Sequence, residues 1–335
     1  MTKQITSTTL FSLLQGFFTD RLMNQRQVSP HTIASYRDSF RLLVDFARQQ
    51  LKKEPQSLTL SDLDAPLIVA FLNHLEQDRT NGARTRNARL AAVHSFFHYM
   101  ALHEPTLSAL IQRVLAIPSK RFNRRPVEFL VRSEVDALLA SPDPNTWQGC
   151  RDRTILLLAA QTGLRVSELT GLLCQDIVFG TGAHVHCQGK GRKERCTPLR
   201  KDAVNMLHRW LQERKGQDKE PLFPNSRGGF LSRDGVEYIL GKYVAVAEKQ
   251  CPSLKKKRIS PHVLRHTAAM DLLCHGVDTA VIALWLGHES QDTVQVYLHA
   301  DLDLKEKALS KTVSSNVRAG RYRPSDKLLA FLKSL

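Results

Sequence analysis

Apolar residues recur at helical spacing along most of this 335-residue chain, and this period constrains its fold more than any other feature. The clearest case follows Ser29, a residue type that caps helices, and Pro30, which suits a first helical turn. Apolar positions then repeat every three or four residues at Ile33, Tyr36, Phe40, Leu43 and Phe46. Similar patterns run from residue 8 to about 115 without a convincing strand pattern. They predict a helical N-terminal domain.

In one segment of the chain, the spacing of the apolar residues changes from a helical to an alternating pattern. Residues 183–199, AHVHCQGKGRKERCTPL, alternate between apolar and polar positions, turn at Gly189 and Gly191, and then alternate again. This pattern is typical of a two-stranded hairpin, here with a lysine-rich tip. Helical patterns lie on both sides of it. The sequence therefore predicts a mainly α fold with a small antiparallel sheet, in the α+β class.

The length allows two domains of ordinary size, each with its own core. A basic stretch with prolines at both ends, IPSKRFNRRP, has no apolar period and reads as an extended linker. The predicted organisation has four segments: a helical N-terminal domain at 1–116, the linker at 117–126, a domain of helices and strands at 127–312, and a C-terminal tail at 313–335.

The charge of the chain indicates a polyanionic partner. Lysine and arginine number 48 against 32 aspartates and glutamates, for a net charge of +16 and a pI near 9.8. Residues 1–126 and residues 127–335 each carry +8, so both domains can meet backbone phosphates. Solvated surface charge is the alternative for any one residue. The candidate DNA contacts are Arg84, Arg86, Arg89, Lys120, Arg121, Arg124, Arg125 and Lys193.

Several classes of protein and cofactor are disfavoured. No 18-residue apolar run occurs, so we expect no membrane span and a soluble intracellular protein. The six cysteines form no CxxC pair, which argues against a zinc ribbon or a secreted disulfide framework. A phosphate-binding GxxxxGK[ST] loop and an acidic cluster for paired magnesium ions are missing as well. We therefore expect no metal and no cofactor.

The stretch SPHVLRHT places His262 and His266 four residues apart, a spacing that can hold a metal ion on a helix. Val263 stands where a zinc protease needs its glutamate, and Arg265 would repel a cation. Arginine binds anions instead. Because Ser260 and Pro261 fit a helix start, the pattern indicates a phosphate site near a helix N-terminus. His266 points about 100° away from its neighbour Arg265, which suggests a supporting role.

Four further features have ordinary explanations when taken singly. In TGLRVSEL, Arg165 precedes Glu168 by three residues on a predicted helix, so that the carboxylate can orient the guanidinium. Lys190 lies at the predicted hairpin tip, where a solvated lysine is also common. His288 follows a glycine in LGHES, and Tyr297 lies nine residues later in a segment where packing is the usual role of tyrosine.

Together, TGLRVSEL, GKGRKER, SPHVLRHT, LGHES and the later tyrosine closely resemble the tyrosine recombinase, or phage integrase, family, with an Xer-like catalytic domain. The resemblance implies two domains that clamp double-stranded DNA. It also implies Arg165 and Arg265 as phosphate clamps, Lys190 as general acid with Lys193 as its rival, His262 and His288 as supporting groups, and Tyr297 as the nucleophile.

The predicted function is site-specific recombination through a 3'-phosphotyrosyl intermediate, without ATP or metal. Two guanidinium forks can stabilise the charge of a pentavalent phosphorus, and exchange of one phosphoester for another conserves bond energy. We expect a homotetramer on two DNA sites, serving a mobile element in the nucleoid region of a bacterial cytoplasm. A relaxing enzyme like type IB topoisomerases and a non-catalytic DNA-binding factor are the alternatives.

The C-terminal stretch RPSDKLLAFLKSL predicts a short amphipathic helix capped by Ser325. Its apolar face consists of Leu328, Phe331, Leu332 and Leu335. A helix this short must bury that face against protein. Docking on a neighbouring protomer is the prediction, and folding back on its own domain is the alternative.

Overall fold

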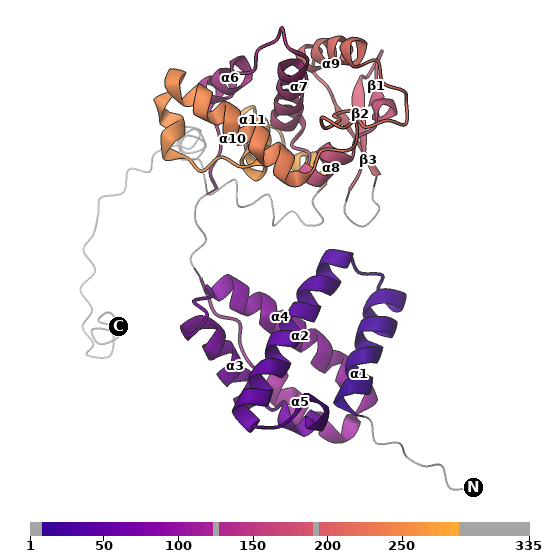
Figure 1. The fold of residues 1–335 in the computed structure, drawn as a ribbon, viewed down its shortest axis with the longest axis vertical. Coiled ribbons are helices and arrows are strands. Elements are labelled where there is room, and N and C mark those ends of the chain that lie inside the picture. The colour runs from indigo at the N-terminus through magenta and orange to yellow at the C-terminus, as the bar shows by residue number, and fades with distance from the viewer. Residues whose placement is uncertain (1–8, 123–126, 190–193, 288–335) are drawn as a thin grey trace, which may run out of the picture. The chain divides into compact units, whose positions relative to one another are not determined.

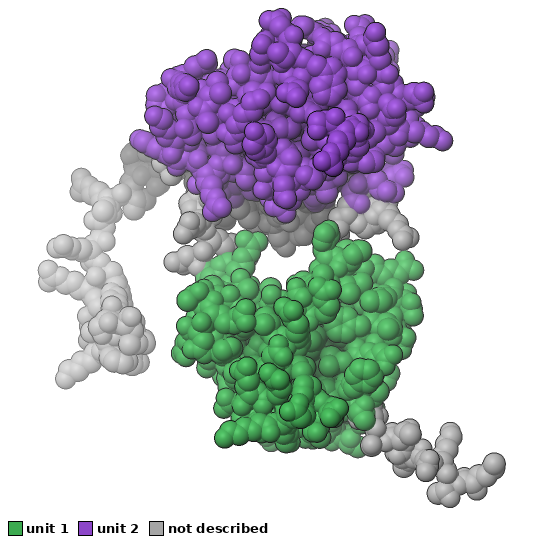
Figure 2. Space-filling model, viewed as in Figure 1, with its two compact units in different colours: residues 1–125 green, residues 126–335 purple. Residues whose placement is uncertain are grey.

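The computed structural model of the chain describes residues 9–122, 127–189 and 194–287. Contacts along the chain divide it into two compact units, residues 1–125 and residues 126–335 (Figure 2). The boundary between the units falls after Arg125, within the predicted linker at 117–126. Within the described residues, no helix combines the length and apolar character that crossing a membrane requires.

Unit 1 is helical throughout its described residues (Figure 1). Its main helices are α1 (Leu10–Gly16), α2 (Pro30–Leu51), α3 (Ala65–Gln77), α4 (Ala83–His103) and α5 (Ser108–Leu115). A π-helix, η1 (Phe17–Gln25), continues α1, and 3₁₀ turns occupy η2 (Pro55–Ser57), η3 (Leu60–Asp62) and η4 (Pro105–Leu107). The predicted absence of strands is therefore confirmed for this part of the chain.

Side-chain caps and aromatic packing hold unit 1 together. Ser29 caps α2 by accepting from the Thr32 amide, as the sequence predicted, and Asp64 caps α3. In the core, the Phe17 ring contacts the rings of Phe40 and Phe96 edge-on, with centroids 6.1 and 5.5 Å away. Such edge-to-face pairs add to the burial of these large side chains.

Unit 2 combines helices with one small sheet. Its helices are α6 (Arg132–Ala140), α7 (Trp147–Thr162), α8 (Val166–Gly171), α9 (Lys201–Arg214), α10 (Arg233–Gln250), α11 (Pro261–Cys274) and α12 (Thr279–Leu286), with 3₁₀ turns η5 (Cys174–Asp176) and η7 (Pro252–Lys256). The strands β1 (Ile177–Val178), β2 (His184–Gln188) and β3 (Glu194–Pro198) form an antiparallel sheet in the order β1-β2-β3. The mainly α prediction with a small antiparallel sheet is confirmed.

The predicted hairpin is present as β2 and β3, with Cys187 opposite Arg195 and Val185 opposite Thr197. Strand β1 was not predicted, because two residues are too few to show an alternating pattern. The inward face of the hairpin includes Val185 and Thr197, both fully buried. Arg195 lies on this same face, an unusual place for a charged residue.

Helix α7 forms the centre of unit 2. Ile155, Leu156 and Leu158 are each 1% exposed, and buried residues occur around most of its circumference. Helices α6, α9 and α11 contact it (Figure 1). A helix buried on nearly all sides cannot shift without disrupting the core. Helix α11, which carries His262 and Arg265, is therefore held in place by α7.

Candidate active site

The two predicted phosphate-clamp arginines are anchored on consecutive backbone carbonyls. Arg265, on α11, donates from Nη2 to the Leu286 carbonyl at 2.7 Å. Arg165 donates from Nη2 to the Gly287 carbonyl at 3.0 Å. Adjacent acceptors place the two guanidinium groups beside each other. The structure thus brings together residues that lie 100 positions apart in the sequence.

The carbonyls belong to the C-terminal ends of two helices. Arg265 also donates from Nη1 to the carbonyl of Gly163, which caps the C-terminus of α7, at 2.6 Å. Leu286 is the last residue of α12. Helix C-termini carry partial negative charge and therefore stabilise cations. Arg265 is 4% exposed, so two helix ends compensate a buried positive charge.

Glycine is required at both of these helix ends. Gly163 and Gly287 each have φ of +63°, in the left-handed region that residues with a Cβ disfavour. A Cβ on Gly163 would lie 2.6 Å from Leu286 Cδ2, and a Cβ on Gly287 would lie 2.8 Å from Arg195 Nη1. The glycines therefore permit both the turns and the close approach of the arginines.

The prediction that Arg165 lies on a helix is wrong. Helix α7 ends at Thr162, Gly163 reverses the chain, and α8 begins at Val166, so Arg165 is the extended residue that precedes α8. The pair with Glu168 nonetheless forms, since Glu168 is the third residue of α8 and reaches back to the helix start. It accepts from the Arg165 amide at 2.7 Å and from Arg165 Nη1 at 2.9 Å.

Arg195 of β3 is a member of the site that sequence reasoning missed. Its Nη1 and Nη2 donate to the two oxygens of Glu168 at 3.0 and 2.7 Å. Burial raises the pKa of Glu168, but hydrogen bonds from Arg195 and from Arg165 outweigh burial and lower it below the usual range. The available signal was an arginine on the inward side of an alternating hairpin, which needs a buried carboxylate as partner.

His262 lies in the first turn of α11, near the two clamp arginines. Desolvation lowers its pKa, and the positive charges of Arg233, Arg265 and Arg165 lower it further. The imidazole is therefore neutral at pH 7 and can accept a proton. Arg233, at the start of α10, is a further cation near His262 that the sequence analysis did not single out.

His266 is half-buried one turn further along α11. Burial lowers its pKa to about 4, with smaller contributions from His262 and Arg265. Ser260 occupies the predicted cap position of α11, but its side chain makes no capping hydrogen bond. In the described part of the chain, no group of three or more potential metal-binding side chains converges.

Six predicted residues lie outside the described ranges: Lys190, Lys193, His288, Tyr297, Arg124 and Arg125. Their roles stay predictions. The described part of the site consists of the two clamp arginines, the Glu168–Arg195 pair and His262.

The prediction that Arg86 contacts DNA is wrong, because its guanidinium is buried inside unit 1. The residue is 5% exposed and lies 3.5 Å from a Glu76 oxygen. It also donates to the Pro118 carbonyl at 3.4 Å, which fixes the chain beyond α5 to α4. Similarly, Arg89 is half-buried and joins α4 to α2 through the Ser35 carbonyl at 3.0 Å.

The remaining described candidates for DNA contact are exposed. Arg84 lies in the first turn of α4, and Arg121 follows the last helix of unit 1. The Lys120 side chain is half-exposed and pairs with Glu76 at 2.6 Å. These three side chains are accessible to a phosphate backbone.

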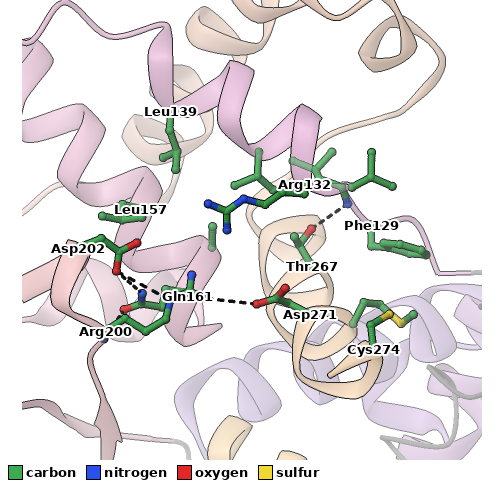
Figure 3. Close-up of a pocket in the computed structure, with 15 residues that line it drawn as sticks. Phe129, Arg132, Leu139, Leu157, Gln161, Arg200, Asp202, Thr267, Asp271 and Cys274 are labelled. Carbon is green, nitrogen blue, oxygen red and sulfur yellow. Dashed lines mark hydrogen bonds and ion pairs between the residues drawn. The ribbon is translucent and has the colours of Figure 1, made fainter. Parts of the chain in front are cut away.

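A cavity of about 340 Å³ lies beside α11 (Figure 3). At about 100° per residue, the α11 residues that line it face away from Arg265. Thr267, Met270, Asp271 and Cys274 line it from α11, with residues of α6, α7 and the start of α9. Much of the lining is apolar, and its charged rim is paired internally, as in the Arg200–Asp271 contact. None of the three predicted site residues Arg165, His262 and Arg265 lines it.

Comparison with known proteins identifies the family. Residues 128–303 match the model of the phage integrase family, and residues 16–104 match its N-terminal SAM-like domain. The chain belongs to the phage integrase family. It is a tyrosine recombinase, an enzyme that breaks and rejoins DNA strands.

Individual relatives agree with this assignment. The "Putative integrase/recombinase y4rC" of Sinorhizobium fredii is 57% identical over 97% of this chain and 98% of its own length. Tyrosine recombinase XerC of Pelobacter propionicus is 36% identical over 84% of this chain and 89% of its own.

Solved structures share the fold. XerH site-specific recombinase bound to palindromic difH substrate aligns with a TM-score of 0.65 at 21% identity, over 83% of this chain and 79% of that one. The Tn1549 transposon integrase in complex with circular intermediate DNA aligns with a TM-score of 0.66 at 16% identity, over 89% of this chain and 98% of that one.

Proposed function

We propose that this recombinase acts at specific DNA sites by linking Tyr297 to the 3' phosphate of each cut strand, with Arg165 and Arg265 holding the scissile phosphate. The observation that supports this proposal best is the anchoring of both guanidinium groups on the adjacent carbonyls of Leu286 and Gly287. Two planar forks side by side match the non-bridging oxygens of one phosphodiester.

In the proposed step, the Tyr297 oxygen attacks phosphorus while the bond to the 5' oxygen breaks. Negative charge grows on the non-bridging oxygens in the transition state, and fixed guanidinium groups stabilise it without reorganising. A phosphotyrosyl ester replaces the phosphodiester. The free 5' hydroxyl of a second strand can reverse the reaction, so no ATP is consumed.

Two protons must move in this step. The phenol of Tyr297 loses one, and His262 is available to accept it because burial and the neighbouring cations lower its pKa and so keep the imidazole unprotonated at pH 7. Lys190 gives one to the leaving 5' oxygen, and Lys193 is its rival for that role. His288 supports the phosphate by hydrogen bonding.

The decisive experiment uses a nicked suicide DNA substrate. Tyr297→Phe should bind DNA as the wild type does and form no covalent adduct on a denaturing gel, because only the attacking hydroxyl is lost. An adduct with this variant would place the nucleophile elsewhere.

Lys190→Ala should recover cleavage on a substrate whose bridging 5' oxygen is sulfur, a leaving group that needs no proton. If the sulfur substrate instead rescued Lys193→Ala and not Lys190→Ala, Lys193 would be the general acid.

We also propose that the protein joins two DNA sites as a homotetramer, for integration, excision or transposition of a mobile element. The y4rC name of the 57% identical relative supports an integrase role. Strand exchange between two labelled sites would be the expected product. Relaxation of supercoiled DNA without strand exchange would favour the alternative function, a DNA-relaxing enzyme similar to type IB topoisomerases.

The proposed DNA clamp consists of a domain at 1–116, the linker at 117–126 and a catalytic domain at 127–312. Its contacts are Arg84, Arg89, Lys120, Arg121, Arg124, Arg125 and Lys193. A DNA-bound protein of this kind is expected in the bacterial nucleoid.

The tail at 313–335 is proposed to dock on a neighbouring protomer. The cavity behind α11 is a suitable acceptor, because its lining is largely apolar and the predicted tail helix has one apolar face. Deleting residues 323–335 should preserve DNA binding and abolish strand exchange. Ala160→Phe, which fills the cavity, should reproduce that loss. Normal strand exchange by the truncated protein would contradict docking of the tail on a neighbouring protomer. An unfolded truncated protein would indicate that the tail packs against its own domain.

A further inference from the structure

One carboxylate lies between two arginines in the candidate site. The Glu168 side chain is 3% exposed, and each of its oxygens accepts a hydrogen bond from Arg195. The same two oxygens accept from the amide and from Nη1 of Arg165. The Arg195 fork is therefore bidentate, whereas the Arg165 guanidinium uses a single nitrogen on this carboxylate.

The charges of the three groups explain why a second arginine is needed. Glu168 and Arg165 alone sum to zero, so an ionised Glu168 would compete with a DNA phosphate for the Arg165 guanidinium. Arg195 raises the sum to one positive charge. Its own pKa is lowered by burial but raised more by Glu168, so it stays charged. The Glu168 and Arg195 side chains are only 3% and 12% exposed, so water screens their charges less than it would on an open surface.

The position of Arg195 links it to the other anchor of the clamp. Its side chain is 12% exposed, and its Nη1 lies so close to Gly287 that a Cβ there would be 2.8 Å away. The Gly287 carbonyl is the acceptor for Arg165 Nη2. Arg195 thus binds Glu168 and lies beside Gly287, the two residues whose oxygens hold the Arg165 guanidinium.

We propose that Arg195 is a positioning residue for phosphate binding: it neutralises Glu168 and so leaves the charge of Arg165 available to the scissile phosphate. This inference rests on the proposed function of Arg165 as a clamp. It predicts that Arg195 acts through charge at the phosphate and not only through the stability of the fold.

The test compares single-turnover cleavage of two suicide substrates, one with a normal scissile phosphate and one with a neutral methylphosphonate. Arg195→Ala should slow cleavage of the phosphate roughly 10²-fold, the size expected when a reacting group is mispositioned. The deficit should shrink at least several-fold on the methylphosphonate, which carries no charge to neutralise. Arg195→Lys, which keeps the charge without the fork, should lie between wild type and Arg195→Ala.

Arg151 provides a matched control. Its side chain is 10% exposed, and it contacts Asp152 through Nε and Nη2 at 2.9 and 2.8 Å. Arg151→Ala should lower the melting temperature as Arg195→Ala does, without changing the ratio of the two cleavage rates. Equal deficits of Arg195→Ala on both substrates would overturn the inference and leave Arg195 a purely structural residue.

A double variant tests the charge argument directly. If Arg195 neutralises Glu168, then Arg195→Ala combined with Glu168→Gln should cleave the phosphate faster than Arg195→Ala alone. A double variant that is equally slow or slower would contradict the inference. A wild-type protein that forms no adduct at Tyr297 would instead overturn the proposed function itself, so the two failures are distinguishable.

Discussion

The two units of this recombinase bury charge very differently. Among the described residues of unit 1, Arg86 is the charged side chain that lies below the surface, within a core of phenylalanine and leucine. Unit 2 buries Glu134, Arg151, Asp152, Glu168 and Arg265. Each buried charge must be compensated by hydrogen bonds or by an opposite charge, and it stabilises a fold less than an apolar group would.

The difference follows from what each unit has to do. Unit 1 can meet DNA with exposed side chains, so its interior needs only apolar packing. Unit 2 must hold cations at fixed positions, because preorganised charge lowers a barrier more than mobile charge does. The partners are backbone carbonyls in the case of Arg265 and a carboxylate in the case of Arg195.

The largest expected effect comes from removing a buried charge of unit 2. Arg265→Ala should slow formation of the covalent adduct by about 10²- to 10³-fold, the loss typical of one oxyanion contact. DNA affinity, measured by gel shift at fixed salt, should change only a few-fold, since other phosphate contacts remain. A parallel loss of affinity and cleavage would make Arg265 an ordinary DNA contact and remove the distinction between the units.

A second effect concerns stability at low pH. The pKa of His266 is lowered to about 4, whereas in the unfolded chain it returns to its ordinary value. The unfolded state therefore binds the proton first, and stability is complete above pH 6.5 and is lost as the pH falls toward 4. Between these limits the loss should be on the order of 2 to 3 kcal/mol.

Thermal unfolding of wild type and His266→Gln across this pH range measures the effect. The variant cannot take up the proton, so its melting temperature should fall less steeply with acid. Parallel curves for the two proteins would show that the imidazole is solvated in the fold and that unit 2 tolerates its charge.

The smallest effects separate two arginines of unit 1 that are one helical half-turn apart. Arg86→Met should lower the free energy of unfolding by about 1 to 3 kcal/mol, because the Pro118 carbonyl loses a partner, and should leave DNA affinity unchanged. Arg84→Ala should leave stability within about 0.5 kcal/mol and should reduce the salt slope of DNA binding by about 1. Urea unfolding and salt-dependent gel shifts test the pair, and reversed results would show that burial does not decide their roles.

Local sequence rules predicted the elements of this protein well. The helical spacing after Ser29 corresponds to α2. The alternating pattern on either side of Gly189 corresponds to the hairpin of β2 and β3. Each depends on residues within a few positions of one another. The family motifs likewise predicted roles for Arg165 and Arg265 without any structure.

The tertiary structure alone decided how these residues are held. Arg165 reaches the Gly287 carbonyl 122 residues away, and Arg265 reaches Gly163 across 102 residues. Arg86 has the same local pattern as exposed Arg84, but the chain beyond α5 covers it. Arg195 became a candidate only when β3 brought it to Glu168, 27 residues earlier. Periodicity determines which face of an element is apolar, whereas the partner of a buried charge depends on how distant elements pack.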